Sequence, residues 1–278
     1  MYDARTKAPL PILGAAMPIS ALPEHLDWIM ADQRDLELQD FVAAEMLEGD
    51  WRAYAAEARR LLNGHSGRLG IHGPFWGFSI ATQDPGVAAV VRLRMDQGLS
   101  VCAELGATQM VIHSPYTTWD HQNLDNIPGA REGLVGRVHD VLAPAVKRAE
   151  ALGVTLVIEN IEDCDPALRV ELARSFASKA VKVSIDTGHA HYAHASTGAP
   201  PVDYYVKAAG DMLDHVHVQD ADGYADRHWE PGMGTVNWPA VFAALGALDV
   251  TPRLNLELRD KSRNRAGAAW LEGAGLAR

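Results

Sequence analysis

The sequence has little cysteine, no long apolar run and no basic stretch, and each absence removes a class of protein. Its two cysteines, Cys102 and Cys164, are too few for a disulfide framework and suit a reducing compartment. No apolar run reaches the roughly 20 residues that a transmembrane helix needs. The N-terminal stretch has a proline-broken apolar part and no clear cleavage site, so we do not interpret it as a signal peptide. We therefore expect a cytoplasmic protein with no membrane partner.

Basic residues are also scarce relative to acidic ones, which bears on the kind of partner. Lys and Arg number 25 against 36 Asp and Glu, giving a formal net charge of -11, and no run rich in Lys or Arg occurs. Proteins that bind nucleic acid usually present a basic surface, because phosphate contacts supply most of the non-specific affinity. The charge therefore disfavours nucleic acid as a partner, although a local basic groove or bound cations could offset it.

Short apolar runs alternate with longer amphipathic stretches, which is typical of an α/β protein with a parallel sheet. Strands are expected at Ile12–Met17, Asp35–Gln39, Arg68–His72, Gln109–His113, Val154–Glu159, Lys182–Asp186, Asp214–Gln219 and Arg253–Glu257. Helices are expected near Pro23–Ala31, Trp51–Leu62, Pro85–Leu105, Arg131–Leu152, Ala167–Ser178, Val202–Ala209, Trp238–Leu248 and Ala266–Gly273. The run GHAHYAHASTGAPP after the sixth strand is expected to be a loop. No linker or repeat divides the chain, so residues 1–278 are expected to form one domain.

Residue alternation within the later strands separates a barrel from an open sheet, which would share much of this element order. In the run HVHV, Val216 and Val218 lie on one face and His215 and His217 on the other, and three further strands divide in the same way. A barrel needs an apolar outer face beneath its helices, whereas its upper interior can carry polar chemistry. This parity favours a (β/α)8 TIM barrel with polar groups at the C-terminal mouth of its lumen.

Six expected strands end on or near a residue that could ligate a metal. These residues are His72, His113, Glu159, Asp186, His217 and Glu257. Further candidates lie shortly beyond strand ends: His189, Asp226 and His228. Imidazole and carboxylate together suit Zn, Mn, Co or Fe, whereas oxygen ligands alone would suit Mg or Ca. Each residue alone is ordinary in a folded protein, but their recurrence at one depth on successive strands predicts a metal site. His215, one layer deeper, is expected to pack beneath or support it.

Five runs then carry a resemblance to a known family. VIEN, SIDTGHA, HVHVQDADG, DRHWEPGMGTVNW and LELRD occur together in this order. The chain resembles the xylose-isomerase-like TIM-barrel superfamily from about its third to its eighth strand, and this group includes sugar isomerases, epimerases and the endonuclease IV class. The resemblance implies a divalent ion (Mn, Zn, Co or Mg). Its ligands would be Glu159, Asp186, His217 and Glu257, while His189 and Arg227 would hold substrate oxygens.

The leading hypothesis is therefore an isomerase or epimerase, or a related dehydratase, acting on a small sugar, ketose or polyol-derived carbonyl compound. The resemblance implies that Glu159 and Glu257 are an acid/base pair that moves protons through a metal-bound enediolate. Aromatic residues near the mouth could stack on the substrate or could simply pack loops. They are Phe75, Trp76, Tyr116, Trp119 and Trp229. A homodimer or homotetramer is common in the group that the chain resembles.

The alternative is an endonuclease IV-like phosphodiesterase that acts at abasic sites in DNA with up to three zinc ions. That class uses a larger ligand set, and this sequence has a candidate for every position. Beyond the four residues of the single-ion site, the candidates are His72, His113, His189, Asp226 and His228. The acidic balance weighs against this alternative. A non-catalytic barrel is the third possibility, but degenerate barrels tend to lose ligands and none is visibly missing here.

Overall fold

Eight short strands close into one parallel barrel in the computed structural model, which describes residues 9–278. The first eight residues of the N-terminal stretch considered above lie outside the described part. The strands are β1 (Gly14–Met17), β2 (Leu36–Leu38), β3 (Leu69–His72), β4 (Gln109–His113), β5 (Thr155–Glu159), β6 (Val181–Asp186), β7 (Leu213–Val218) and β8 (Arg253–Leu256). Each strand pairs with the next, and β8 pairs with β1. The predicted (β/α)8 TIM barrel is confirmed, and both ends of every strand lie within two residues of the predicted bounds.

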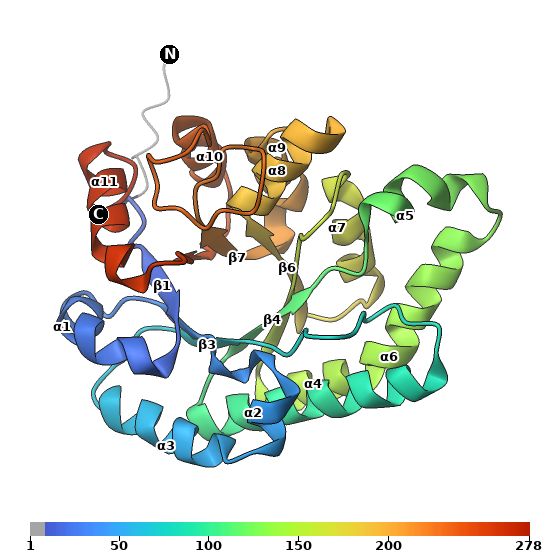
Figure 1. Ribbon diagram of the computed structural model, residues 1–278, viewed down its shortest axis with the longest axis horizontal. Coiled ribbons are helices and arrows are strands. Elements are labelled where there is room, and N and C mark those ends of the chain that lie inside the picture. The colour runs from blue at the N-terminus through green and yellow to red at the C-terminus, as the bar shows by residue number, and fades with distance from the viewer. Residues whose placement is uncertain (1–8) are drawn as a thin grey trace.

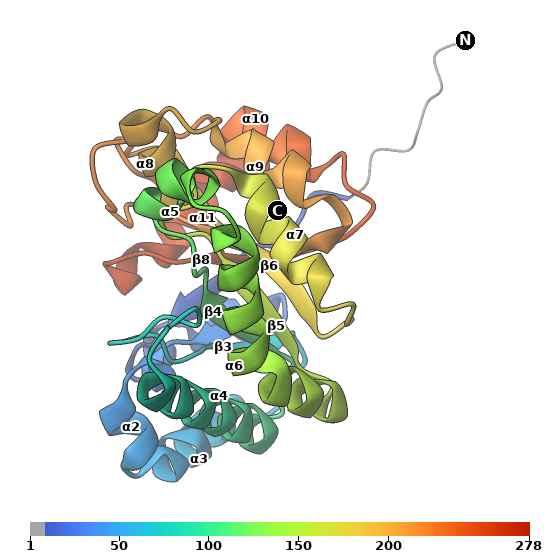
Figure 2. The same ribbon diagram turned by 90° about the vertical axis from the view of Figure 1, so that its right-hand side faces the viewer.

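Helices surround the barrel, as both views of the ribbon show (Figures 1 and 2). They are α1 (Leu22–Ala31), α2 (Ala44–Glu48), α3 (Trp51–Leu61), α4 (Pro85–Leu105), α5 (Thr118–Asn123), α6 (Ala130–Leu152), α7 (Pro166–Ser175), α8 (Thr187–Thr197), α9 (Val202–Ala209), α10 (Trp238–Leu245) and α11 (Asn264–Gly273). Short 3-10 turns occupy Ile19–Ala21, Asp40–Val42, Leu124–Asn126, Gly210–Met212 and Lys261–Arg263. None of the helices within residues 9–278 has the length and apolarity required to cross a membrane.

The segment after β6 is a helix, so the loop expected there is wrong for most of its length. Helix α8 begins directly after Asp186, whose Oδ1 accepts the backbone N–H of His189 at 2.7 Å and so caps the helix. Its small and polar residues give no apolar stripe, which is why periodicity does not reveal it. The cap places the Asp186 carboxylate at the point where strand becomes helix.

The outer face of the barrel and its helices share one apolar core, as the strand parity predicts. Val216 and Val218 of β7 are at most 1% exposed and belong to this core. The lumen instead holds polar side chains that are equally buried. Those at most 1% exposed include Glu37, Gln109, Ser184, His215, His217 and Asn255. A polar lumen must satisfy its own hydrogen bonds, so the contacts of these residues define what the barrel can hold.

Candidate metal centre

The nine ligand candidates come together in three groups, each with potential ligand atoms within 4.8 Å of one another. The central cluster is Glu159, Asp186, His217 and Glu257. The first side cluster is His72, His113 and Glu159, and the second side cluster is His189, Asp226 and His228. Because these residues come from the ends of five strands, the start of α8 and the loops after β7 and β8, barrel closure is what brings them together.

His217 lies at the middle of the central cluster. Its Nδ1 is 3.0 Å from Glu159 Oε1 and 3.3 Å from Glu257 Oε2. Glu159, Asp186 and His217 are at most 1% exposed, and Glu257 is 8% exposed. Three carboxylates and one imidazole are therefore gathered with almost no access to bulk water.

Two oxygens of the central cluster show that a divalent cation fits it. Glu159 Oε2 and Asp186 Oδ2 are buried and have no hydrogen-bond partner. A buried carboxylate oxygen without a partner is costly, and a bound cation would satisfy it. Asp186 belongs to the central cluster alone, whereas Glu159 Oε2 also faces His72 and His113 of the first side cluster. The mixture of carboxylate and imidazole ligands suits Zn, Mn or Co.

The first side cluster brings two imidazoles against the other oxygen of Glu159. The Nε2 atoms of His72 and His113 lie 3.4 Å apart and are 3.7 and 4.0 Å from Glu159 Oε2. His72 donates from Nδ1 to the carbonyl of Gly73 at 3.0 Å, which turns its Nε2 toward the cluster. Phe75 stacks on the His113 ring at 4.0 Å. Glu159 thus faces two clusters with its two oxygens.

The second side cluster has histidines fixed in the same manner. Nδ1 of His189 donates to the carbonyl of Asn160 at 3.0 Å, and Nδ1 of His228 donates to the carbonyl of Glu257 at 2.9 Å. Their Nε2 atoms therefore face Asp226 Oδ1, at 3.5 and 3.0 Å. Backbone carbonyls that orient imidazoles in this way are common around metal sites.

The electrostatics of the mouth favour a bound proton on His217, His228 and Asp186 and disfavour one on His113. Burial opposes charge on His217, but three surrounding carboxylates raise its pKa well above the ordinary value. The pKa of His228 rises to about 9, because its hydrogen bond to Asp226 and nearby carboxylates outweigh burial. Burial, reinforced by neighbouring glutamates, raises the pKa of Asp186 to about 7. Burial and the neighbouring His72 lower the pKa of His113 to about 3.

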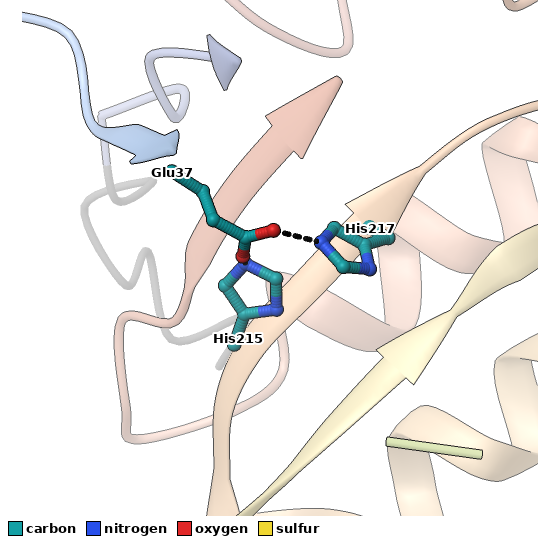
Figure 3. Close-up of side chains that lie close together, drawn as sticks. All are labelled: Glu37, His215 and His217. Carbon is teal, nitrogen blue, oxygen red and sulfur yellow. Dashed lines mark hydrogen bonds and ion pairs between the residues drawn. The ribbon is translucent and has the colours of Figure 1, made fainter. Parts of the chain in front are cut away.

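Glu37 of β2 is a buried residue of this centre that sequence reasoning missed. Figure 3 shows its carboxylate between two histidine rings of β7. Oε1 lies 3.0 Å from His217 Nε2, and Oε2 lies 3.1 Å from His215 Nε2. The expectation that His215 packs or supports below the site agrees with this contact. The available signal was the run LEL, in which a glutamate between leucines points into the lumen.

Gln219, also missed from sequence, links the central and second side clusters. Its Nε2 donates to Asp186 Oδ1 and to Asp226 Oδ1, each at 3.0 Å. Its Oε1 accepts the backbone N–H of His228 at 2.9 Å. A Cβ atom at Gly188 would come within 2.2 Å of the Gln219 amide, so only glycine leaves room for it.

Glu257 is oriented by a short chain of contacts from the other side of the mouth. Gln39 Nε2 donates to Glu257 Oε1 at 2.5 Å, and Lys261 Nζ donates to Gln39 Oε1 at 2.7 Å. This bond occupies Oε1 and leaves Oε2 directed at His217. Neither Gln39 nor Lys261 was singled out from the sequence, because neither side chain is a usual metal ligand and their contact with Glu257 joins segments far apart in the chain.

Arg227, expected to hold substrate oxygens, lies outside the three clusters. Its guanidinium pairs with Asp222 at 2.9 Å and lies over the ring of Trp229 at 5.2 Å. The hydrogen bond and charge of this pair lower the pKa of Asp222 to about 2. A role of Arg227 in substrate binding therefore remains a prediction and would require it to leave this partner.

The expected aromatic residues divide into buried and exposed ones. Tyr116 is 3% exposed and lines a cavity of about 160 Å³ that also borders His113. Trp229 lines a cavity of about 330 Å³ beside His228. Trp76 and Trp119 are 65% and 59% exposed. Two small cavities thus open next to the two side clusters.

Comparisons with known proteins agree with this architecture. Residues 33–277 match the family described as xylose isomerase-like TIM barrel. A protein from Thermus thermophilus, soaked with ZnCl2, is 27% identical, with a TM-score of 0.73 over 96% of this chain and 99% of that one. A D-tagatose 3-epimerase-like protein has a TM-score of 0.75 at 18% identity, covering 94% of this chain and 96% of that one.

A 2-oxo-tetronate isomerase of Cupriavidus necator is 28% identical over 139 residues. That match covers 47% of this chain and 50% of the isomerase, so the aligned stretch spans half the length of that relative. Sugar epimerases and isomerases are therefore among the proteins that this chain resembles.

Proposed function

Because the chain belongs to the xylose isomerase-like TIM-barrel family, we propose that it is a metal-dependent isomerase or epimerase. Its substrate would be a small sugar, ketose or polyol-derived carbonyl compound. The observation that carries the proposal is the central cluster, in which Glu159 of β5 and Glu257 after β8 approach His217 with one oxygen each. Paired carboxylates around one cation suit proton removal beside a carbonyl group.

A divalent cation held by Glu159, Asp186, His217 and Glu257 would bind adjacent carbonyl and hydroxyl oxygens and stabilise the negative charge that develops as a proton leaves. The protein's own residues supply the proton transfers. Burial would raise the pKa of Glu159, but the charge of His217 and its hydrogen bond to Glu159 outweigh burial and lower the pKa. Glu159 is therefore ionised at neutral pH and can accept a proton.

Glu257 would deliver the second proton. Gln39 holds its Oε1, so Oε2 is the atom available to the substrate or the cation. Glu257 is more exposed than Glu159, at 8% against 1%, and can therefore exchange its proton with water more readily. With two carboxylates, one can remove a proton from a substrate carbon and the other can return one. Return to the same carbon from the opposite face inverts it, and return to the neighbouring carbon completes an isomerisation.

The test is solvent exchange. Wild-type protein with Mn, Co, Mg or Zn would be screened in D2O against ketoses, inososes, hydroxypyruvate and dehydroshikimate, and deuterium incorporation measured by mass spectrometry. Glu159→Gln and Glu257→Gln should each abolish incorporation, because an amide cannot take a proton. Gln109→Leu, a buried change at the start of β4, should retain it. Retained incorporation in both glutamine variants would overturn the two-glutamate mechanism.

One observation favours a second function. All nine residues of a three-ion set lie in three clusters, and Glu159 is shared between two of them. This supports a multi-zinc phosphodiesterase that acts at abasic sites, in which clustered ions activate water. The net charge of -11 weighs against a DNA partner. About three tightly held zinc ions per chain together with nicking of an abasic duplex would establish this alternative. One exchangeable ion and no nicking would exclude it.

A further inference from the structure

A buried carboxylate next to the central cluster has no place in the chemistry above. Glu37 is 1% exposed and reaches from β2 across the lumen to His215 and His217 of β7 (Figure 3). Its ion pairs are with these two histidines, at 3.1 and 3.0 Å. A buried carboxylate is costly unless both oxygens are bonded, so the imidazoles are what stabilise it in this position.

The direction of each hydrogen bond in this group follows from the chemistry of the atoms. A carboxylate only accepts, so the two Nε2 atoms that face Glu37 both donate. On the far side, Ser184 Oγ lies 2.8 Å from His215 Nδ1, and its hydroxyl can donate to that atom and hold the ring. His217 therefore directs Nδ1 away from Glu37 and toward the central cluster, where Glu159 Oε1 lies 3.0 Å away.

Glu37, His215 and His217 also place donor atoms within 4.8 Å of one another, as a metal site would. Their bonding argues against a cation there. Each polar side-chain atom of the three residues already has a partner. The unpartnered oxygens belong to Glu159 and Asp186, in the central cluster. These two carboxylates, rather than Glu37, have room for a cation, and the Glu37 group lies behind His217 as a support.

We propose that Glu37, held in place by His215, positions His217 so that its Nδ1 faces the cation of the central cluster. The proposal rests on the metal-binding part of the proposed function and is independent of the substrate. A carboxylate behind a metal-binding histidine fixes the ring and makes it a better ligand, and loss of such a partner typically weakens metal binding by about 10–100-fold. Glu37 is thus a positioning residue that acts through His217.

The experiment measures metal affinity without substrate. Dissociation constants for Zn²⁺ and Mn²⁺ would be determined on the full chain by competition with a chromophoric chelator. Glu37→Leu should weaken the tightest site by about 10–100-fold. Glu37→Gln should weaken it less, because its amide oxygen can still accept from His217. Gln109→Leu is the matched control, since it replaces another buried lumen side chain, one that donates to Asp214 instead. Its metal affinity should equal that of the wild type.

The thermal unfolding midpoint of each variant, measured without metal, shows whether the variant is folded. A loss of metal affinity in a folded variant then reports on the position of His217 rather than on folding. Folded Glu37→Leu and Glu37→Gln proteins with wild-type affinity would overturn the proposal, and so would an equal loss in Gln109→Leu. If Glu37→Leu does not fold, the test uses Glu37→Gln together with Ser184→Ala, which removes the hydroxyl that holds the His215 ring. Unchanged metal affinity in both variants would overturn the proposal.

The outcomes also distinguish this proposal from the proposed function. A wild-type protein that binds neither ion would overturn both. If metal binding depends on Glu37 but the protein has no isomerase activity, the positioning role is supported and only the proposed sugar chemistry is contradicted. In zinc-loaded protein labelled with ¹⁵N-histidine, the spectrum of His217 should show hydrogen on Nε2. Hydrogen on Nδ1 would overturn the assignment.

Discussion

Histidine and carboxylate side chains at the barrel mouth hold protons that a cation must displace. The pKa of His228 is raised to about 9 and that of Asp186 to about 7, while the pKa of His217 is raised well above its ordinary value. Below its pKa each group holds a proton that competes with the metal, and above its pKa that competition ends. Zinc affinity should therefore rise between about pH 6 and pH 9, roughly tenfold per pH unit for each proton displaced.

Calorimetric titration with Zn²⁺ in buffers of different ionisation enthalpy would count the protons released. His139→Gln, a change at an outlying histidine that bonds to Ser175, should leave that count unchanged. An affinity that does not vary over this pH range, with no protons released, would contradict the expected protonation of the mouth.

Gly188 is a residue whose missing side chain shapes the centre. An alanine there would place Cβ about 2.2 Å from the Gln219 amide, which must then move away from Asp186 and Asp226. Gly188→Ala should lower the free energy of unfolding by about 1–3 kcal/mol through overpacking and should weaken metal binding. Urea unfolding and chelator competition would measure the two effects.

Gly136→Ala is the matched control for this change. It is also a helical glycine, but a Cβ at Gly136 meets nothing within 4 Å. The alanine should therefore be neutral or slightly stabilising, with unchanged metal affinity. Equal behaviour of the two alanine variants would show that Gln219 does not need the space beside Gly188.

At the scale of elements, helix α7 ties together the ends of two strands that carry ligands. Arg169 is fully buried, and its Nη1 donates to the carbonyls of Ile158 on β5 and Ser184 on β6. Its Nε donates to Asp163 at 3.2 Å. Arg169→Met would leave Asp163 buried without its cation and should cost about 3–5 kcal/mol of stability, measured by urea unfolding.

A double-mutant cycle tests whether the stability lost in Arg169→Met comes from the ion pair between Arg169 and Asp163. Adding Asp163→Asn to Arg169→Met should recover part of the stability, because the uncompensated charge is removed. Arg60→Met breaks an exposed ion pair with Glu57 and should leave the unfolding midpoint unchanged. Additive effects of the two buried substitutions would show that Arg169 and Asp163 do not act as a pair.

The elements differ in how far the sequence predicts them, for physical reasons. Strand alternation predicts the buried strands and the inward histidines of β7, because the period of two is a local property. Helix α8 is not predicted, since it is set by the Asp186 cap and by packing rather than by an apolar stripe. Glu37 is missed because β2 lies far in sequence from its partners, His215 and His217. Its contact with them exists only when the barrel closes.

For the whole molecule, closure of the barrel gathers carboxylates that repel one another unless a cation lies among them. Metal removal should therefore lower the thermal midpoint. A ligand present at 100 times its Kd stabilises the folded state by about 2.7 kcal/mol, and for a chain of this size that corresponds to a shift of about 5 °C. Scanning calorimetry with and without a chelator would measure it.

The same calorimetric scans on Asp186→Asn test whether the metal-dependent shift in thermal midpoint arises from the central cluster. This variant keeps the size of the side chain at the start of α8 but removes one charge from the central cluster, so its midpoint should respond much less to added metal. Gln109→Leu should respond as the wild type does, because its contacts with Asp214 are remote from the ligands. A metal-dependent shift that is as large in Asp186→Asn as in the wild type would place the stabilising ion outside the central cluster. No shift in the wild type at saturating Zn²⁺ and Mn²⁺ would mean that the gathered carboxylates are stabilised by protons and hydrogen bonds alone.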